Sequence, residues 1–187
     1  IARVIADGHA ALAPSRRPAA ATERNIDALV RGGESSEVEF KGTLRTNLHT
    51  NAPDERITWG VLRTIAAFLN QQGGALVVGV LDDGDPVGYQ ADGFRTEDEA
   101  LDYLTDLLAE HIGAGHLREV HPRFEDYDGV RVLVVECWGG RRPAYLQRDG
   151  RRALYVRDGA TCVELTGQDA EDYIARRFAP TRTPGHG

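Results

Sequence analysis

The sequence predicts a single α+β domain, a mixed α/β arrangement in which helices and strands share one core. Three observations lead to this fold class. Apolar residues recur at helical spacing in four segments, alternation or continuous apolar runs mark strands between them, and glycine- and aspartate-rich turns separate the segments. The chain has 187 residues, 41% of them hydrophobic, which is enough to bury one core.

The domain is expected to open with a short helix and a strand. Thr22 is a candidate N-cap for the helix, and the Gly32–Gly33 pair ends it. Residues 37–44 then alternate apolar and polar side chains with the period of a strand. Glu39 and Lys41 therefore share one face of that strand, opposite the core face.

An amphipathic helix and a buried strand are expected after a polar loop. Residues 57–69 place their apolar side chains on one helical face, and we interpret Gly73 and Gly74 as the C-cap of this helix. The continuous apolar run at 75–81 is typical of a buried strand, and the turn-forming sequence DDGDPVG ends it.

The second half is expected to begin with a helix over 97–112, which a capping box of Thr96 and Glu99 starts. An Asp-Gly pair joins the two strands of each following hairpin, as is common in tight turns. The remaining predicted elements are strands at 117–127, 130–138, 144–147 and 153–157 and a helix at 167–178.

The two ends of the chain lack this patterning. Residues 1–21 are expected to be a linker or tail, because the sequence APSRRPAAA contains two prolines that oppose a long helix. Residues 180–187 are expected to form a flexible C-terminal tail, which leaves 22–179 as the domain. The chain contains no methionine, so we expect it to belong to a longer protein with an upstream domain.

Composition excludes several classes of protein. No apolar run approaches the roughly 18 residues of a membrane span, and no secretion signal is recognisable, so we expect no membrane contact from this segment. The two cysteines, Cys137 and Cys162, cannot form a disulfide framework or a four-ligand zinc site by themselves. We therefore expect a reducing, cytoplasmic setting.

Glu39 and Lys41 form the centre of a candidate catalytic site. A carboxylate beside an ammonium group suits metal-dependent phosphodiester cleavage, in which the carboxylate holds a divalent ion and the lysine assists water or phosphate. Glu34 lies five residues upstream, and Asp82, or Asp83 if the strand register differs, follows the buried strand. Three carboxylates would suffice for one or two Mg²⁺ or Mn²⁺ ions.

Each part of this candidate site also has a purely structural interpretation. The Glu39–Lys41 pair is compatible with a solvated ion pair on a strand face, and Asp82–Asp83–Gly84 with a turn. Lys41 is, however, the only lysine in the chain, and it falls within the combination.

A second candidate feature is a basic run at residues 141–159. It contains six arginines against two aspartates, with Tyr145 and Tyr155 interleaved, within a chain of net charge −7. Such a reversal of charge is expected where a protein contacts a phosphate backbone, with tyrosines available for base stacking. The alternative is a hairpin whose charges discourage edge pairing. The candidate nucleic-acid-binding residues are Arg141, Arg142, Arg148, Arg151, Arg152 and Arg157.

Three segments together resemble the Schlafen-type AlbA domain, which is also described as a divergent AAA or DNA-binding domain. They are GESSEVEFKG at 33–42, IAAFLNQQGGALVVGVLDDGDPVGY at 65–89 and RPAYLQRDGRRALYVRDGATCVEL at 142–165. The resemblance covers residues 24–178 with the motifs in family order. The chain departs from the pattern at residues 69–72 and in a longer loop at 49–55.

The resemblance implies small mixed sheets flanked by helices. It also implies nucleic-acid chemistry, since paired copies of the domain in vertebrate Schlafens form an endoribonuclease that cleaves tRNA and rRNA with a divalent metal. The family's three carboxylates correspond here to Glu34, Glu39 and Asp82, and its lysine corresponds to Lys41. Single-copy bacterial members are often described only as nucleic-acid- or ATP-binding modules.

The function we expect is a metal-dependent endoribonuclease that acts on structured RNA such as tRNA, with a homodimer as the expected assembly and defence as the expected role. The first alternative is a non-catalytic nucleic-acid-binding module of a transcription regulator. The second is an ATP-binding domain, which the absence of a Walker-type glycine loop opposes.

Overall fold

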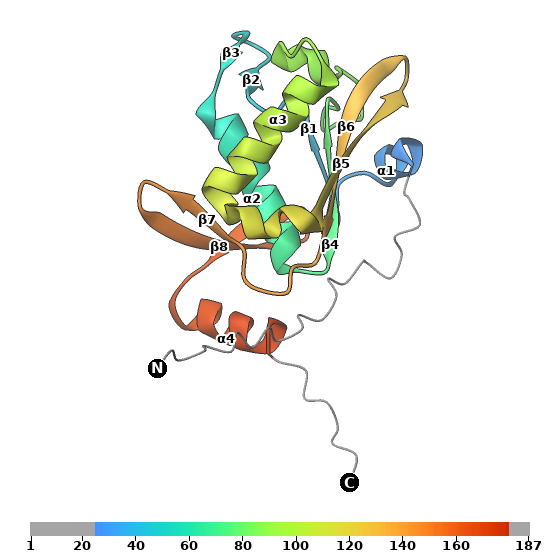
Figure 1. The fold of residues 1–187 in the computed structure, drawn as a ribbon. Coiled ribbons are helices and arrows are strands. Elements are labelled where there is room, and N and C mark those ends of the chain that lie inside the picture. Colours follow the sequence, from blue (N-terminus) through green and yellow to red (C-terminus); the bar gives the residue numbers. More distant parts are fainter. Residues whose placement is uncertain (1–24, 180–187) are drawn as a thin grey trace, which may run out of the picture.

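The computed structural model describes residues 25–179, which form two main sheets with helices packed against them (Figure 1). The expected linker at 1–21, the cap at Thr22 and the tail at 180–187 lie outside the described residues. Asn25 is the N-cap of the first helix, because its side chain accepts a hydrogen bond from Ala28 N at 2.9 Å.

The larger sheet has four strands in the order β1-β4-β6-β5. Its strands are β1 (Val38–Lys41), β4 (Gly73–Val78), β5 (Val120–Tyr127) and β6 (Val130–Trp138). β1 runs parallel to β4, whereas the other pairs are antiparallel. β1 is an edge strand, with one side of its backbone unpaired within this sheet.

Helices cover both faces of this sheet. They are α1 (Ile26–Gly32), α2 (Glu55–Asn70) and α3 (Glu97–Leu108). One core lies between the sheet and α2 with α3, and it contains Phe68, Leu76 and Leu133. A smaller core lies between the opposite face and α1, and it contains Ile26, Phe40 and Val134. Because Phe40 faces α1, its strand neighbours Glu39 and Lys41 face α2.

The second sheet is an antiparallel meander that packs against α2 (Figure 1). It consists of β7 (Tyr145–Arg148), β8 (Arg151–Asp158) and β9 (Thr161–Leu165), and α4 (Gly167–Arg177) follows it. The short elements are β2 (Thr46–Asn47), β3 (Ala52–Pro53), η1 (Tyr89–Asp92), η2 (Ala109–Gly113) and η3 (Ala114–Glu119).

Two side-chain amides at the C-terminal end of α2 form hydrogen bonds with the backbone of the second sheet and of the segment that precedes it. The fully buried side chain of Asn70 donates to Ala144 O and Tyr155 O, each at 2.9 Å, and accepts from Ala144 N at 2.8 Å. Gln71 donates to Arg157 O at 2.9 Å and accepts from Arg157 N at 3.1 Å. These bonds fix the β7–β8 hairpin beside α2.

The structure confirms the α+β class and differs from the expected elements in several places, of which β2 and β3 in the expected polar loop and the end of α3 at Leu108 are two. Gly73 and Gly74 begin β4 instead of capping α2, and a Cβ on Gly74 would collide with the ring of Phe68. Residues 117–119 belong to the helical turn η3. β9 was not expected, because its alternation is short and lies between polar turns. Within residues 25–179, no helix combines the length and apolarity that a membrane span requires.

Candidate nucleic-acid interface

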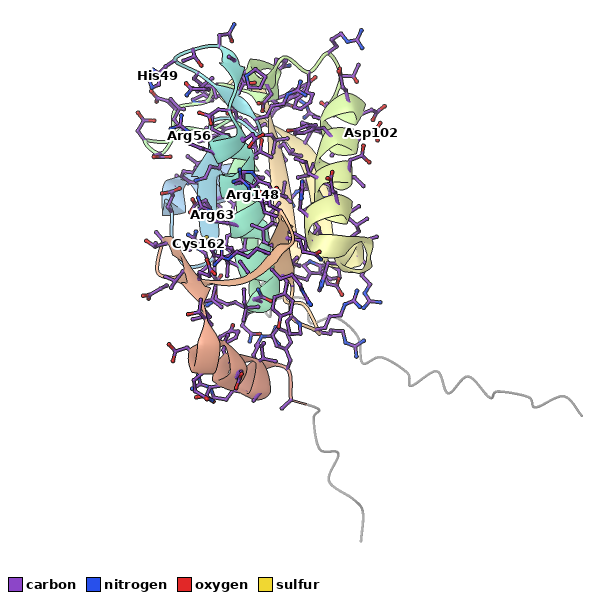
Figure 2. The ribbon with its side chains drawn as sticks, turned by 90° about the vertical axis from the view of Figure 1, so that its left-hand side faces the viewer. His49, Arg56, Arg63, Asp102, Arg148 and Cys162 are labelled. Atoms are coloured by element: carbon purple, nitrogen blue, oxygen red, sulfur yellow. The ribbon has the colours of Figure 1, made fainter. Side chains whose placement is uncertain are left out.

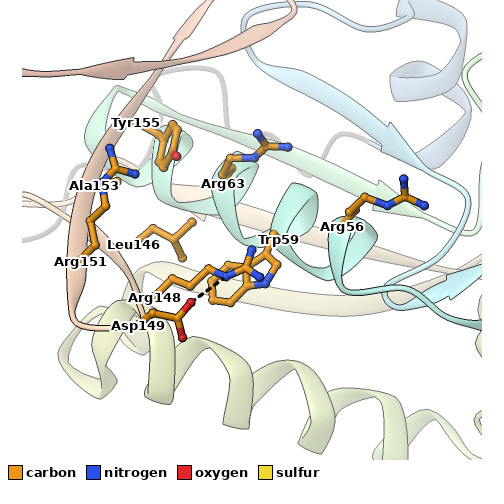
Figure 3. A pocket seen from close by; sticks show the side chains of 9 residues that line it. All are labelled: Arg56, Trp59, Arg63, Leu146, Arg148, Asp149, Arg151, Ala153 and Tyr155. Carbon is orange, nitrogen blue, oxygen red and sulfur yellow. Dashed lines mark ion pairs between the residues drawn. The ribbon is translucent and has the colours of Figure 1, made fainter.

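A pocket of about 530 Å³ lies between the first half of α2 and the β7–β8 hairpin (Figure 3). Its lining combines cations with aromatic and apolar side chains. The residues are Arg56, Trp59, Arg63, Leu146, Arg148, Asp149, Arg151, Ala153 and Tyr155. A pocket of this size is within the range that holds a small ligand or one nucleotide. Arg56, Arg63 and Arg148 lie on one side of the molecule (Figure 2).

Carboxylates accompany three of the four arginines in the pocket. Arg56 pairs with Asp54 at 2.7 Å, Arg148 with Glu55 at 3.2 Å, and Arg151 with Glu164. The three arginine side chains are each at least half exposed, so an anion of a ligand can reach them and compete with the carboxylates. Arg56 also holds the pKa of the Asp54 carboxyl well below its usual range.

Arg63 differs from the other arginines of the pocket. It projects from α2 into solvent, and no carboxylate within residues 25–179 forms an ion pair with it. An exposed arginine whose charge no carboxylate neutralises is the strongest attractor for phosphate in such a group.

The aromatic part of the pocket is centred on Trp59, which Arg148 and His111 contact. The guanidinium carbon of Arg148 lies 4.6 Å from the centre of the Trp59 ring, and the ring of His111 meets that ring edge-on at 4.7 Å. Tyr155 forms the far wall, where its hydroxyl donates to Glu164 at 3.2 Å. Burial and the neighbouring Glu164 charge both raise the pKa of Tyr155, so it stays a neutral hydrogen-bond donor.

Glu39 is the centre of a cluster on β1, where it is held between two cations. One carboxylate oxygen pairs with Lys41, and the other lies 2.8 Å from Arg157 Nη1. The Arg157 side chain has no exposed surface, and its Nη2 donates to Ser35 O at 2.7 Å. The cluster of one carboxylate and two cations therefore carries a net positive charge.

Glu34 and Asp82 do not join this cluster. Glu34 folds back along the open edge of β1, where one oxygen accepts the Phe40 N–H at 2.9 Å. Asp82 and Asp83 are exposed in the turn after β4, and the Asp83 side chain accepts from Asp85 N at 3.1 Å. Asp83 thus has the turn-forming role that is typical of aspartate.

The residues present do not form the divalent-metal site that the family resemblance implies. Across residues 25–179, no group of three or more His, Cys, Asp or Glu side chains is close enough to hold an ion. Lys41 and Arg157 already neutralise Glu39, and their charges oppose a further cation at that carboxylate. We assign no chemical step to a metal ion in this arrangement.

The Glu39 cluster and the arginine pocket adjoin at Gly60, in the interior of α2. The position that a Cβ would take on Gly60 is 4.0 Å from Lys41 Cε and 4.0 Å from Arg63 Nη2. Lys41, the expected catalytic lysine, therefore lies beside the cation that borders the pocket. Strand β1 and helix α2 thus bring the two cations to the same glycine.

The basic run at 141–159 divides into three parts. Arg148 and Arg151 line the pocket, and Arg152 is exposed with its guanidinium carbon 4.2 Å from the centre of the Tyr145 ring. Arg141 and Arg142 precede β7 and lie outside the lining. The expectation for Arg157 is corrected, because its buried guanidinium neutralises Glu39 and cannot reach a phosphate backbone.

Sequence reasoning missed the contribution of α2 to the pocket. Arg56, Trp59 and Arg63 recur at intervals of three and four residues, so they form one stripe along the helix. That stripe lies beside the apolar face that was used to predict the helix. A tryptophan at the border of the apolar face, with an arginine on either side of it in the stripe, was the signal that could have identified it.

Comparisons with known proteins find a matching family and a solved structure with a similar fold. Residues 34–166 match the family described as "Schlafen, AlbA_2". The crystal structure of the DIP2311 protein from Corynebacterium diphtheriae aligns with a TM-score of 0.55 and 18% identity, over 81% of this chain. The chain spans only 31% of that protein. A comparison with curated proteins gives no match.

A second solved structure is similar at lower score. It is the solution structure of the N-terminal domain of a RecG-related protein from Nitrosomonas europaea, with a TM-score of 0.48 and 21% identity. The alignment covers 86% of this chain and 95% of that domain.

Proposed function

The chain belongs to the Schlafen, AlbA_2 family, and we propose that it binds nucleic acid in the pocket between α2 and the β7–β8 hairpin. The observation that carries this proposal is the composition of the pocket wall. Arginines of α2, β7 and β8 face a shared space together with Trp59 and Tyr155. Cations that contact phosphates and aromatic groups that stack on bases are the two requirements for binding single strands.

RNA is the favoured partner, because the sequence motifs are similar to those of a family that includes ribonucleases. Binding is tested by titrating labelled tRNA, unstructured RNA and duplex DNA with the protein and measuring fluorescence anisotropy. Chromatography with light scattering on the same samples tests the expected homodimer. The proposal is wrong if none of the three nucleic acids binds more tightly than a matched polyanion such as heparin.

Phosphodiester cleavage is the second candidate function. The location of the Glu39–Lys41 pair next to Arg63 favours it, because a phosphate held there would lie beside a carboxylate and an ammonium group. Incubating the three substrates with Mg²⁺, with Mn²⁺ and with EDTA, alongside the Glu39→Gln variant, tests it. Cleavage that the variant loses would support a nuclease, and binding without cleavage would leave the domain a binding module.

A further inference from the structure

Gly60 is unusual among the residues of α2. It occupies the interior of a 16-residue helix, where glycine is less stable than alanine. Packing does not require it, because a Cβ there would meet other atoms only at 4.0 Å, an ordinary van der Waals distance. The glycine therefore leaves helix backbone uncovered between two side chains, and both of these are cations.

We infer that the pocket receives one unpaired nucleotide, whose phosphate lies over Gly60 between Lys41 and Arg63 and whose base enters beside Trp59. This inference rests on the proposed function and specifies its ligand. It adds a phosphate position at the junction of α2 and β1, where Arg63 of the pocket lining meets Gly60 and Lys41, which are not part of that lining.

The charges at the junction favour a phosphate. Lys41 shares Glu39 with the buried Arg157, so the Glu39 carboxylate does not cancel both cations. Arg63 has no ion pair with a carboxylate in the described part of the chain, residues 25–179. A phosphate between Lys41 and Arg63 would gain two charge-assisted contacts, and the bare backbone at Gly60 allows its close approach.

The pocket wall favours a base that is not paired. The guanidinium of Arg148 lies over Trp59, and its outer surface extends the stacked surface toward the pocket. A base within a duplex already has stacking partners on both sides and cannot enter a pocket unless it is extruded. Single strands, loops and bulges present their bases without that cost.

The test compares RNA ligands of one sequence in four forms, namely a single strand, a blunt duplex, the duplex with one bulged nucleotide, and the corresponding nucleoside monophosphate. We expect the single strand and the bulged duplex to bind about tenfold more tightly than the blunt duplex, as one stacked base would provide. The monophosphate is expected to compete for the same site with lower affinity.

Two pairs of variants locate the phosphate. Gly60→Ala is expected to weaken binding of the single strand about fivefold without lowering the melting temperature, and Gly32→Ala in α1, another uncrowded helical glycine, serves as its control. Arg63→Ala is expected to weaken the same binding by a similar factor. Arg95→Ala, which removes an arginine that is exposed and outside the pocket, is its control.

The outcomes separate the two proposals. If all forms of RNA bind with equal affinity and Gly60→Ala leaves that affinity unchanged, while Arg63→Ala still weakens it, the single-nucleotide site is wrong and nucleic-acid binding in the pocket stands. If no RNA binds, the proposed function fails together with the inference. If the monophosphate binds but no oligonucleotide does, the site accepts a free nucleotide and the proposal of a strand in the pocket is wrong.

Discussion

Arg157 Nη1 lies 2.8 Å from Glu39 Oε2, and this pair joins the edge strand of the larger sheet to the second sheet. The arginine is entirely enclosed, and its guanidinium carbon is 5.4 Å from the centre of the Phe68 ring in α2. The pair therefore belongs to the interior of the protein. It holds the Glu39 carboxylate in a fixed position beside Lys41.

Replacement of Arg157 by methionine is expected to destabilise the protein by about 3 kcal/mol, since it leaves a buried carboxylate with only one cation. Urea unfolding of Arg157→Met measures this loss. Glu39→Gln in the same background is expected to recover part of it, because the uncompensated charge is then removed. A loss below about 1 kcal/mol would show that the pair does not hold the two sheets together.

Asn70→Ala tests the link between α2 and the second sheet. The change removes three hydrogen bonds to the backbone of Ala144 and Tyr155, two of them buried, which is expected to cost about 2–4 kcal/mol. RNA affinity is expected to fall as well, because the hairpin that carries Arg148 is no longer fixed. Gln168→Ala, which removes an exposed hydrogen bond to Asp172, should change stability by no more than about 0.5 kcal/mol.

Gly60→Ala is expected to raise the free energy of unfolding by about 0.5–1 kcal/mol, because alanine is the better helix former and its methyl group has room. Thermal unfolding of the variant and the wild type provides the comparison. A variant that is less stable than the wild type would mean that packing, rather than a ligand, requires the glycine.

His116 is expected to make stability depend on pH. Burial, and secondarily the positive charge of Arg142, lower the pKa of His116 below the ordinary value of about 6.5. The unfolded chain then binds a proton more readily than the folded protein, so stability falls as the pH drops through about 6.5. The loss levels off below the lowered pKa of the folded state.

Unfolding midpoints measured between pH 8 and pH 5 for the wild type and for His116→Gln check this expectation. The variant should lose less stability on acidification than the wild type does. Parallel profiles for the two proteins would assign the pH dependence to other groups.

The fold class and most elements could be predicted, because the spacing of apolar residues within a segment depends only on that segment. Residues 57–69 lie within α2, and the Asp-Gly pairs form the turns of both expected hairpins. The structure differs from the prediction where contacts between residues far apart in the sequence determine the role of a residue. Gly74 is required by the ring of Phe68, and Asn70 bonds to Ala144, so neither role follows from neighbouring residues.

The candidate site was predictable only in part for the same reason. Alternation placed Glu39 beside Lys41, and two arginines of the predicted basic run, Arg148 and Arg151, line the pocket. Nothing local distinguishes Arg157 from the exposed arginines of the same run. Its burial follows from the packing of β8 against α2, which brings together residues more than 80 positions apart.

The most direct test of the central claim is the affinity of a single-stranded RNA for the wild type, Arg63→Ala and Arg95→Ala, measured by anisotropy at several salt concentrations. We expect Arg63→Ala to weaken binding about fivefold and to lower the salt slope by about one, while Arg95→Ala matches the wild type. Equal affinities and equal slopes for the two variants would contradict nucleic-acid binding in the pocket between α2 and the β7–β8 hairpin.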